Sequence, residues 1–540
     1  MGGAVLTMDR ARPTANAVAV TGGRITAVGN DREVAAFAGP RTRRVDLRGR
    51  TLVPGFGDAH CHPSMAGVGL LQCPLHEVER TTERYVATIR GYAEAHPERP
   101  WVVGDGWYMS AFPGGTPSRH DLDAAVPDRP AFFVNRDGHG AWVNSRALAL
   151  AGITRETADP PDGRIERDED GEPSGTLHEG AVELVRRLLP ETTPDDVAEG
   201  LALAQAYLHR FGITAWQDAW VTPRDLEGYR RFAESGRLTA RAIAGLWWER
   251  DRGNEQIEGF VEARAGSSIG RLEATTVKIM TDGVAENYTA SMLEPYLGED
   301  GAPTGNRGID FVDPQALKSA VAELDRLGFQ VHFHALGDRG VRQALDAVEA
   351  ARRANGMSDM RPHLAHLQVV DPADWPRFAA LDAGANIQPY WACYDEQMVD
   401  LTLPYLRPDR ARLQYPFGSL LRAGARLVGG SDWTVSTPNV MAEIEVAVTR
   451  VSPEIRGAEP FLPEEAIPLD AALRAFTMGA AWAHHRDETT GSIEVGKLAD
   501  LVVLDRDITR ERPDRLGDSR VLLTLVEGES VHEDVALESP

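Results

Sequence analysis

Over the middle of the chain, short apolar runs alternate with longer segments in which apolar residues recur every three or four positions. The short runs are typical of strands buried in a parallel sheet, and the longer segments of amphipathic helices that cover it. Residues 314–327 and 338–354 show the helical pattern best. About eight such units predict an α/β fold built on a distorted (β/α)₈ barrel of the TIM type. The predicted strands are residues 55–62, 212–218, 240–248, 275–283, 329–335, 362–368, 384–391 and 425–432.

Both ends of the chain have a different pattern, with short alternating strands separated by turns. Gly22 and Gly23 are typical of a tight hairpin between two strands. Because the two ends are alike in character, we expect them to share one sheet. The sequence therefore predicts a small β-sandwich formed by residues 1–54 and 488–540, with the barrel occupying 55–487.

The first two predicted barrel strands are separated by about 150 residues, which is far more than a crossover needs. This interval contains strand-like runs and helix-like runs of its own. We interpret residues 63–200 as an inserted α/β subdomain that lies over the mouth of the barrel.

Composition narrows the classes of partner. The net charge is 57 − 81 = −24, which argues against nucleic acid and anionic membranes, since both require a positive surface. Three cysteines do not form a disulfide framework. No secretory signal is visible, and no apolar run approaches the roughly 18 residues of a membrane helix. We expect a cytoplasmic protein that acts on a small molecule and leave a homodimer open.

Histidines cluster at the ends of the predicted strands. His60 and His62 end the first strand and share one face of it. Later strands carry His334 and His366, and Asp432 ends the eighth. The carboxyl ends of barrel strands meet at one mouth, where active sites form. Imidazole and carboxylate ligands together suit zinc, nickel, iron or manganese. Each histidine alone could be an ordinary hydrogen-bonded core residue.

The stretch "ATTVKIMTDG" at residues 274–283 places Lys278 within an apolar run, although only three of the 57 basic residues are lysines. A buried ammonium tends to lose its proton. Lys278 is either a core lysine satisfied by a carboxylate or a functional lysine at the same mouth.

The segment "PGFGDAHCHP" is similar to the signature of the amidohydrolase superfamily, and "VKIMTDG", "HFHALGD", "HLAHLQ" and "GSDWTV" resemble its later metal-site strands in order. The segments "GHGAWVNSRAL" and "GSIEVGKLADLVVLD" resemble the family 3 branch that includes N-substituted formamide deformylases and exoenzyme-regulator-like proteins. The resemblance implies one or two divalent ions, with zinc the expected metal. It assigns His60, His62 and Asp432 to one ion, His334 and His366 to the other, and a carboxylated Lys278 as the bridge.

The activity implied by this resemblance is hydrolysis of an amide-type C–N bond, in an N-substituted amide or formamide, by metal-bound hydroxide with Asp432 as general base and then acid. The same site would also serve an ester, lactone or carbamate hydrolase, or a metal-assisted lyase or isomerase. A non-catalytic scaffold is a third alternative, although such a protein would be expected to lose ligands.

Other residues are candidates for contact with substrate. Gln217 and Asp218 end the second strand, and Asp338 follows His334, where it could instead cap a helix. His139 and Trp142 belong to the predicted insertion. Further expectations are that His332, which lies deeper on the same face as His334, has a core or a supporting role, that His363 faces away from His366, and that His484 and His485 lie on the surface. We expect tryptophans near strand ends to form either an apolar pocket or packing beneath the insertion. These tryptophans are Trp216, Trp220, Trp247, Trp248 and Trp391.

Overall fold

The computed structural model describes residues 1–75, 78–135, 140–160, 163–395 and 397–537. The chain divides into two compact units. Met1–Ser64 together with Ala204–Pro540 form the first unit, and Met65–Leu203 form the second.

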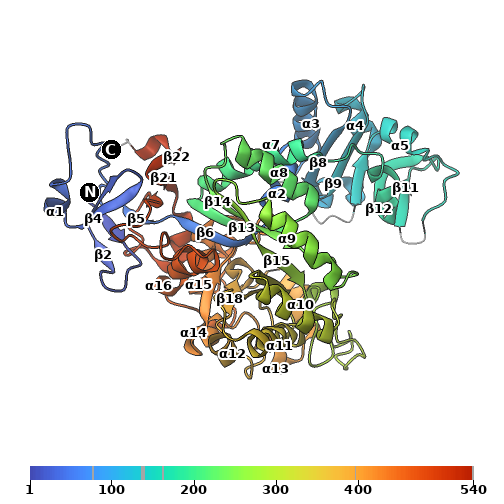
Figure 1. Ribbon diagram of the computed structural model, residues 1–540. Helices are drawn as coiled ribbons and strands as arrows, with labels where there is room; N and C mark the ends of the chain where they lie inside the picture. The colour runs from blue at the N-terminus through green and yellow to red at the C-terminus, as the bar shows by residue number, and fades with distance from the viewer. Residues whose placement is uncertain (76–77, 136–139, 161–162, 396, 538–540) are drawn as a thin grey trace. The chain divides into compact units, whose positions relative to one another are not determined.

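Eight parallel strands of the first unit form one sheet (Figure 1). Their order in the sheet is β19-β18-β17-β16-β15-β14-β13-β6. Beyond the strands, the backbone N–H of Asp432 donates to the His60 carbonyl, and that of His62 donates to the Trp433 carbonyl, both at 2.7 Å. These bonds join the two edges, so the sheet is a nearly closed barrel and the predicted fold class is confirmed. The strands are β6 Phe56–Cys61, β13 Ile213–Val221, β14 Arg241–Trp247, β15 Leu272–Met280, β16 Gln330–Ala335, β17 His363–His366, β18 Gly384–Ile387 and β19 Arg426–Gly429.

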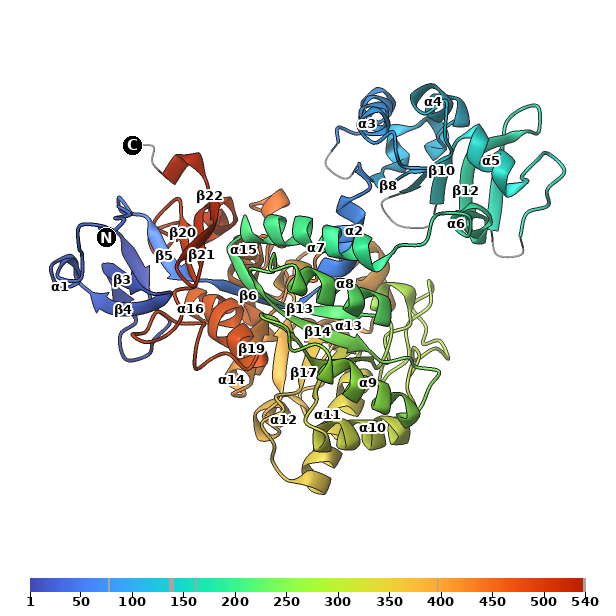
Figure 2. The same ribbon diagram turned by 45° about the horizontal axis from the view of Figure 1, so that its top comes forward.

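Amphipathic helices run along the outside of this sheet (Figure 2). In α11 (Asp338–Asn355) the buried apolar residues recur at helical spacing, as Val341, Ala344, Leu345 and Val348 show. The neighbouring α10 (Pro314–Arg326) begins at Asp313, whose carboxylate accepts from two backbone N–H groups of the first turn. Both predicted helices are confirmed to within a residue. Further barrel helices are α8 Pro223–Glu234, α9 Ile257–Ala265, α12 Trp375–Ala380 and α14 Phe417–Arg422.

The two chain ends share a six-stranded sheet in the order β2-β1-β5-β20-β21-β22, as predicted. A hairpin of β3 and β4 packs on it through a common apolar core. Gly22 and Gly23 form its turn with φ of 58° and 78°, the conformation that favours glycine. The domain limits at 54 and 488 stay a prediction, since contacts group this sheet with the barrel. The strands are β1 Ala4–Leu6, β2 Thr14–Ala15, β3 Ala17–Thr21, β4 Arg24–Gly29, β5 Thr51–Pro54, β20 Leu501–Leu504, β21 Val521–Val526 and β22 Glu529–Glu533.

The second unit has a separate six-stranded sheet in the order β11-β12-β10-β9-β8-β7. Helices α3 (Thr82–Ala95) and α4 (Arg119–Ala125) contribute to one apolar cluster of this unit, and α5 (Ser145–Ala151) contributes to another. The unit has the α/β class predicted for the insertion, and both the limits 63–200 and the placement over the barrel mouth stay predictions. Its strands are β7 Cys73–Pro74, β8 Val102–Trp107, β9 Ala131–Asn135, β10 Gly140–Val143, β11 Gly163–Arg167 and β12 Pro173–Glu179.

In the described part of the chain, none of the helices combines the length and the apolar character that a bilayer crossing requires.

Candidate metal centre

The six predicted ligands lie at, or just after, the carboxyl ends of five barrel strands. His60, Lys278, His334 and His366 belong to β6, β15, β16 and β17. His62 follows β6 by one residue, and Asp432 follows β19 by three. All six residues are buried, none more than 9 % exposed. The parallel strands therefore carry these polar groups to one end of an otherwise apolar barrel.

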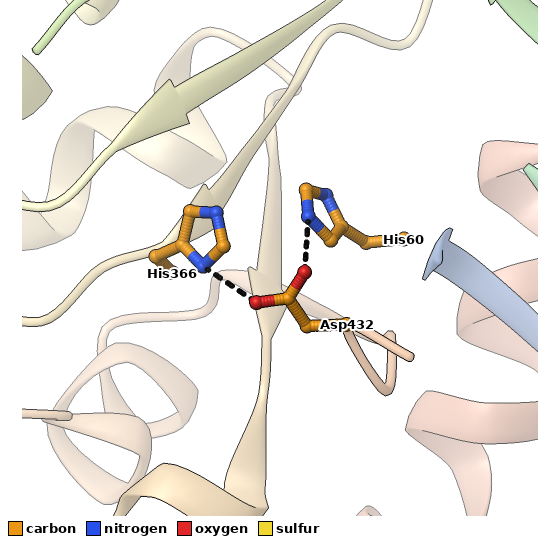
Figure 3. Close-up of side chains that lie close together, drawn as sticks. All are labelled: His60, His366 and Asp432. Atoms are coloured by element: carbon orange, nitrogen blue, oxygen red, sulfur yellow. Dashed lines mark ion pairs between the residues drawn. The ribbon is translucent and has the colours of Figure 1, made fainter. Parts of the chain in front are cut away.

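Asp432 lies between the rings of His60 and His366 and contacts both (Figure 3). Its Oδ1 atom lies 3.2 Å from His60 Nε2 and 3.1 Å from His62 Nε2, and its Oδ2 atom lies 3.9 Å from His366 Nδ1. Burial opposes ionisation of Asp432, but hydrogen bonds from His60 and His62 outweigh it and lower the pKa of the carboxyl well below its ordinary value. The carboxylate is therefore charged.

The imidazoles form one continuous cluster. The ring centroids of His60 and His366 are 4.7 Å apart, and those of His334 and His366 are 4.5 Å apart. Ligand atoms of His60, His366 and Asp432 lie within 4.8 Å of one another, close enough to hold an ion. This grouping joins His366 to the set assigned to the first metal, so the division of the ligands between two ions stays a prediction.

The protonation states of the histidines suit a metal. Burial lowers the pKa of His60 to about 3 despite the pull of Asp432, so the ring is neutral and keeps a lone pair. Buried Nδ1 atoms of His62 and His334 lack a hydrogen-bond partner among the described residues. Unpartnered ring nitrogens beside a charged carboxylate fit a divalent cation, because coordination would satisfy groups that are costly to bury unpaired.

Lys278 is 2 % exposed. Burial lowers the pKa of its ammonium to about 7, against the opposing attraction of Asp432 and Asp282. A large fraction of the side chain is therefore a neutral amine at neutral pH, which distinguishes Lys278 from a lysine held charged by a close carboxylate.

Comparison with known proteins identifies the family. A sequence profile described as the amidohydrolase family matches residues 43–532. The chain belongs to the amidohydrolase family. It is therefore a metal-dependent hydrolase that acts on carbon–nitrogen bonds.

Two curated relatives and one solved structure extend the comparison. The chain is 31 % identical to the protein LONG AFTER FAR-RED 3 of Arabidopsis thaliana, over 98 % of this chain and 90 % of the relative. It is 29 % identical to an N-substituted formamide deformylase of Arthrobacter pascens, over 97 % and 96 %. The fold is similar to that of an uncharacterised metal-dependent hydrolase from Pyrococcus furiosus, with a TM-score of 0.74, 24 % identity, and coverage of 94 % and 98 %.

In this amidohydrolase, two further histidines lie inside the barrel. His332 Nε2 lies 2.8 Å from His60 Nδ1, so the other nitrogen of His60 is the one that faces Asp432. His363 is within hydrogen-bond distance of the Gln217 and Asn386 side chains. His332 thus supports His60, which is one of the two roles expected for it. The expectation that His363 faces away from His366 is wrong.

His363 and His366 both face the barrel interior because strand alternation breaks at the end of β17. His366 has φ of 79° and the next residue, Leu367, has φ of 52°. This left-handed backbone is unfavourable for residues other than glycine, and it turns His366 into the barrel although three positions separate it from His363. Asp432 also has a left-handed φ, of 57°. Such conformations gather at functional sites, where the surrounding structure holds them.

We expect His332→Phe to weaken metal binding by about ten- to a hundredfold, because the hydrogen bond that orients His60 is lost. Competition with a chromophoric chelator measures the affinity. His332→Gln, which can retain an acceptor near His60, should recover part of it. Equal affinity in the phenylalanine variant and the natural protein would show that His60 is oriented by other contacts.

Supporting residues that the sequence analysis missed hold the ligand strands together. The Asp58 carboxylate accepts from the backbone N–H groups of His60 at 3.1 Å and Ser431 at 3.0 Å. Burial raises the pKa of Asp58 to about 6. Gln388 Oε1 accepts from the His366 backbone N–H at 2.7 Å. An acid within the apolar stretch "GFGDAHCH" was the only signal in the sequence for this network.

Asp282, another supporting acid, lies beside His334. Its Oδ1 is 3.6 Å from His334 Nδ1, and the carboxylate accepts from the backbone N–H groups of Ser291 and Gly337 at 2.9 and 2.8 Å. Asp282 therefore joins the loop after β15 to the loop after β16, next to His334, the predicted ligand on β16.

Three predicted substrate contacts have partners within the protein. Gln217 donates to Thr276 Oγ1 at 2.8 Å, and Asp218 accepts from Tyr229 Oη at 2.8 Å. Asp338 pairs with an Arg410 nitrogen at 2.7 Å. The N-cap position of the helix that begins at Asp338 is Gly337, so the capping alternative for Asp338 is wrong. These side chains support strands and loops, and their contact with substrate stays a prediction.

Of the two candidate substrate contacts in the insertion, one lies among the described residues. Trp142 is fully buried in the core of the second unit, where its Nε1 donates to the Ser118 carbonyl at 2.8 Å. Its ring packs against Phe112 at a centroid distance of 5.1 Å. Its role in substrate binding stays a prediction. His139 lies outside the described residues.

Proposed function

We propose that this amidohydrolase hydrolyses an amide-type C–N bond of a small molecule, with N-substituted amides and formamides as the substrate class. The observation that carries the proposal is the meeting of a charged Asp432 with neutral imidazoles beside a lysine whose pKa is about 7. The relative named as an N-substituted formamide deformylase supports the choice of substrate class.

The residues would hold the metal as follows. His60, His62 and Asp432 would bind one ion, His334 and His366 a second, and Lys278 would lie between them. Zinc is the proposed metal, because imidazole and carboxylate are ligands it accepts. When bound, such an ion supplies a Lewis acid that polarises a carbonyl and brings the pKa of water into the neutral range.

Lys278 would act as a carboxylated residue. Its neutral amine attacks CO₂, an N–C bond forms, and one proton is released to solvent, which leaves an anionic carbamate. Burial favours this reaction because it disfavours the competing ammonium form. The anion then contributes negative charge to a cluster whose other members are mostly neutral rings. An arginine could not do this, because its guanidinium stays protonated.

Asp432 would move the proton. Its Oδ atoms border the His60, His62 and His366 rings, so a water among these groups lies within reach of the carboxylate. As the water oxygen attacks the amide carbon, Asp432 takes its proton and then delivers it to the substrate nitrogen as the C–N bond breaks. The products are a carboxylic acid and an amine. The imidazoles are unsuited to this step because they serve as ligands or their supports.

A matched substrate panel tests this function. We expect purified protein to release amine from N-substituted formamides and acetamides, to lose activity after treatment with a chelator, and to regain it when zinc is restored. Detection of amine and acid measures the reaction. If the metal-loaded protein cleaves esters or lactones but none of the amides, the amide proposal fails and the alternative hydrolase reaction on the same site replaces it.

A further inference from the structure

Two stacked tryptophans lie at the ends of neighbouring barrel strands. Trp220 is near the end of β13, and Trp247 is the last residue of β14. Their ring centroids are 4.3 Å apart, and the ring planes differ by 13°. Trp220 is 43 % exposed, although an indole is among the largest apolar side chains. The pair is not absorbed by the barrel core, and the metal centre described above does not use it.

Trp247 belongs to the inner face of its strand. The following residue, Trp248, is buried and packs against Phe260 of the outer helix α9 at a centroid distance of 6.1 Å. Because side chains alternate along a strand, Trp247 projects to the opposite side, toward the barrel interior. Trp220 reaches it from the adjacent strand, since β13 and β14 are paired.

The pairing register connects this tryptophan to the metal centre. Trp247 lies opposite Lys278 in the β14–β15 pair, and Lys278 lies opposite His332 in the β15–β16 pair. Residues in register on parallel strands share a face of the sheet. Trp247, Lys278 and His332 therefore form one row around the barrel, and the tryptophan pair stands on the lysine side of the mouth.

We propose that Trp220 and Trp247 determine specificity by binding an aromatic ring of the substrate, so that the preferred amides carry a ring close to the scissile bond. This inference rests on the proposed function and adds the substrate group that it leaves open. Offset stacking on an indole favours a flat ring over a saturated ring of similar size. A partly exposed, preformed aromatic surface is also what a small-molecule pocket uses to bind the apolar part of its ligand.

The test compares amides that differ only in this ring. One series carries benzyl or cyclohexylmethyl on the amide nitrogen, and a second carries the same groups on the carbonyl carbon. In the metal-loaded protein we expect the benzyl compound of one series to have a kcat/KM about fivefold higher than its cyclohexylmethyl partner, a ratio typical of an aromatic pair. Trp220→Leu and Trp247→Leu should bring this ratio close to one, whereas Trp220→Phe should retain most of it.

A control variant and a binding assay separate failure of this inference from failure of the proposed function. Met357→Ala, an exposed residue just after α11, should leave the ratio unchanged. Tryptophan fluorescence measures binding of benzylamine, phenylacetate and their cyclohexyl analogues without turnover. Ring-selective binding that depends on both tryptophans, in protein that hydrolyses no amide, would support this inference while the proposed function fails. Amide hydrolysis with equal rates for flat and saturated rings, or a preference that survives both leucine variants, would overturn the inference alone.

Discussion

Replacement of Lys278 by arginine is expected to lower kcat/KM by about 10³ or more, which corresponds to about 4 kcal/mol of lost transition-state stabilisation. Arginine keeps a positive charge at the position but cannot be carboxylated, so the site would gain a cation where the proposal requires an anion. We also expect metal content to fall, because a permanent charge on the lysine side of the cluster repels a second ion. Steady-state kinetics and elemental analysis of the same preparation measure both effects.

Two comparisons show whether the loss is chemical. Lys318→Arg is the matched control, because Lys318 is part-exposed and its ion pair with Asp346 is long, at 3.9 Å. This variant should behave like the natural protein. In Lys278→Ala, a small carboxylate such as acetate or propionate should restore part of the activity by supplying the missing anion. Near-normal turnover of Lys278→Arg would remove Lys278 from the reaction.

Asp432→Asn should reduce kcat by about 10³ for amides of alkylamines, within the range for loss of a general acid–base group. An amide side chain keeps the size of the carboxylate but can neither accept the proton from water nor return it to nitrogen. Asp432 is also a predicted ligand, so its two roles must be separated. Loss of proton transfer to the substrate nitrogen depends on the leaving group, whereas loss of a metal ligand does not. For 4-nitroanilides, whose departing nitrogen needs less protonation, the decrease should be clearly smaller.

The control for this variant is Asp313→Asn. Asp313 caps α10, and asparagine is an equally good cap, so neither activity nor thermal stability should change. Rates for alkylamides and nitroanilides, measured at matched metal content, separate the two roles. An equal decrease for both substrate classes would show that Asp432 acts as a ligand without transferring the proton.

Hydrophobic periodicity was sufficient to predict the barrel. All eight strands and both assigned helices lie where the alternation of apolar runs and amphipathic segments indicated, because each pattern reports burial on a defined face. His484 shows the limit of this approach. Its polar neighbours suggested a surface position, but it is 2 % exposed, and burial lowers the pKa of its ring to about 3. That burial depends on packing against distant strands, which local pattern does not encode.

The candidate site was predictable to the extent that it follows strand direction. Residues at the carboxyl ends of parallel strands must meet, so His60, His334 and Asp432 could be grouped without a structure. Asp58 could not, because its partners include a backbone N–H group of Ser431, which lies 373 positions away. The inward orientation of His366 could not be predicted either, since it depends on a left-handed backbone that the residue type does not indicate.

The most direct test of the metal centre is a crystal structure of metal-loaded protein, with diffraction data recorded on both sides of the absorption edge of the bound metal. We expect anomalous peaks within about 2.0–2.3 Å of ligand atoms of His60, His62, His334, His366 and Asp432. We also expect added density on Lys278 Nζ that reaches the metal. Metal bound elsewhere on the protein, or an unmodified Lys278 turned away from a filled site, would contradict the proposed metal centre.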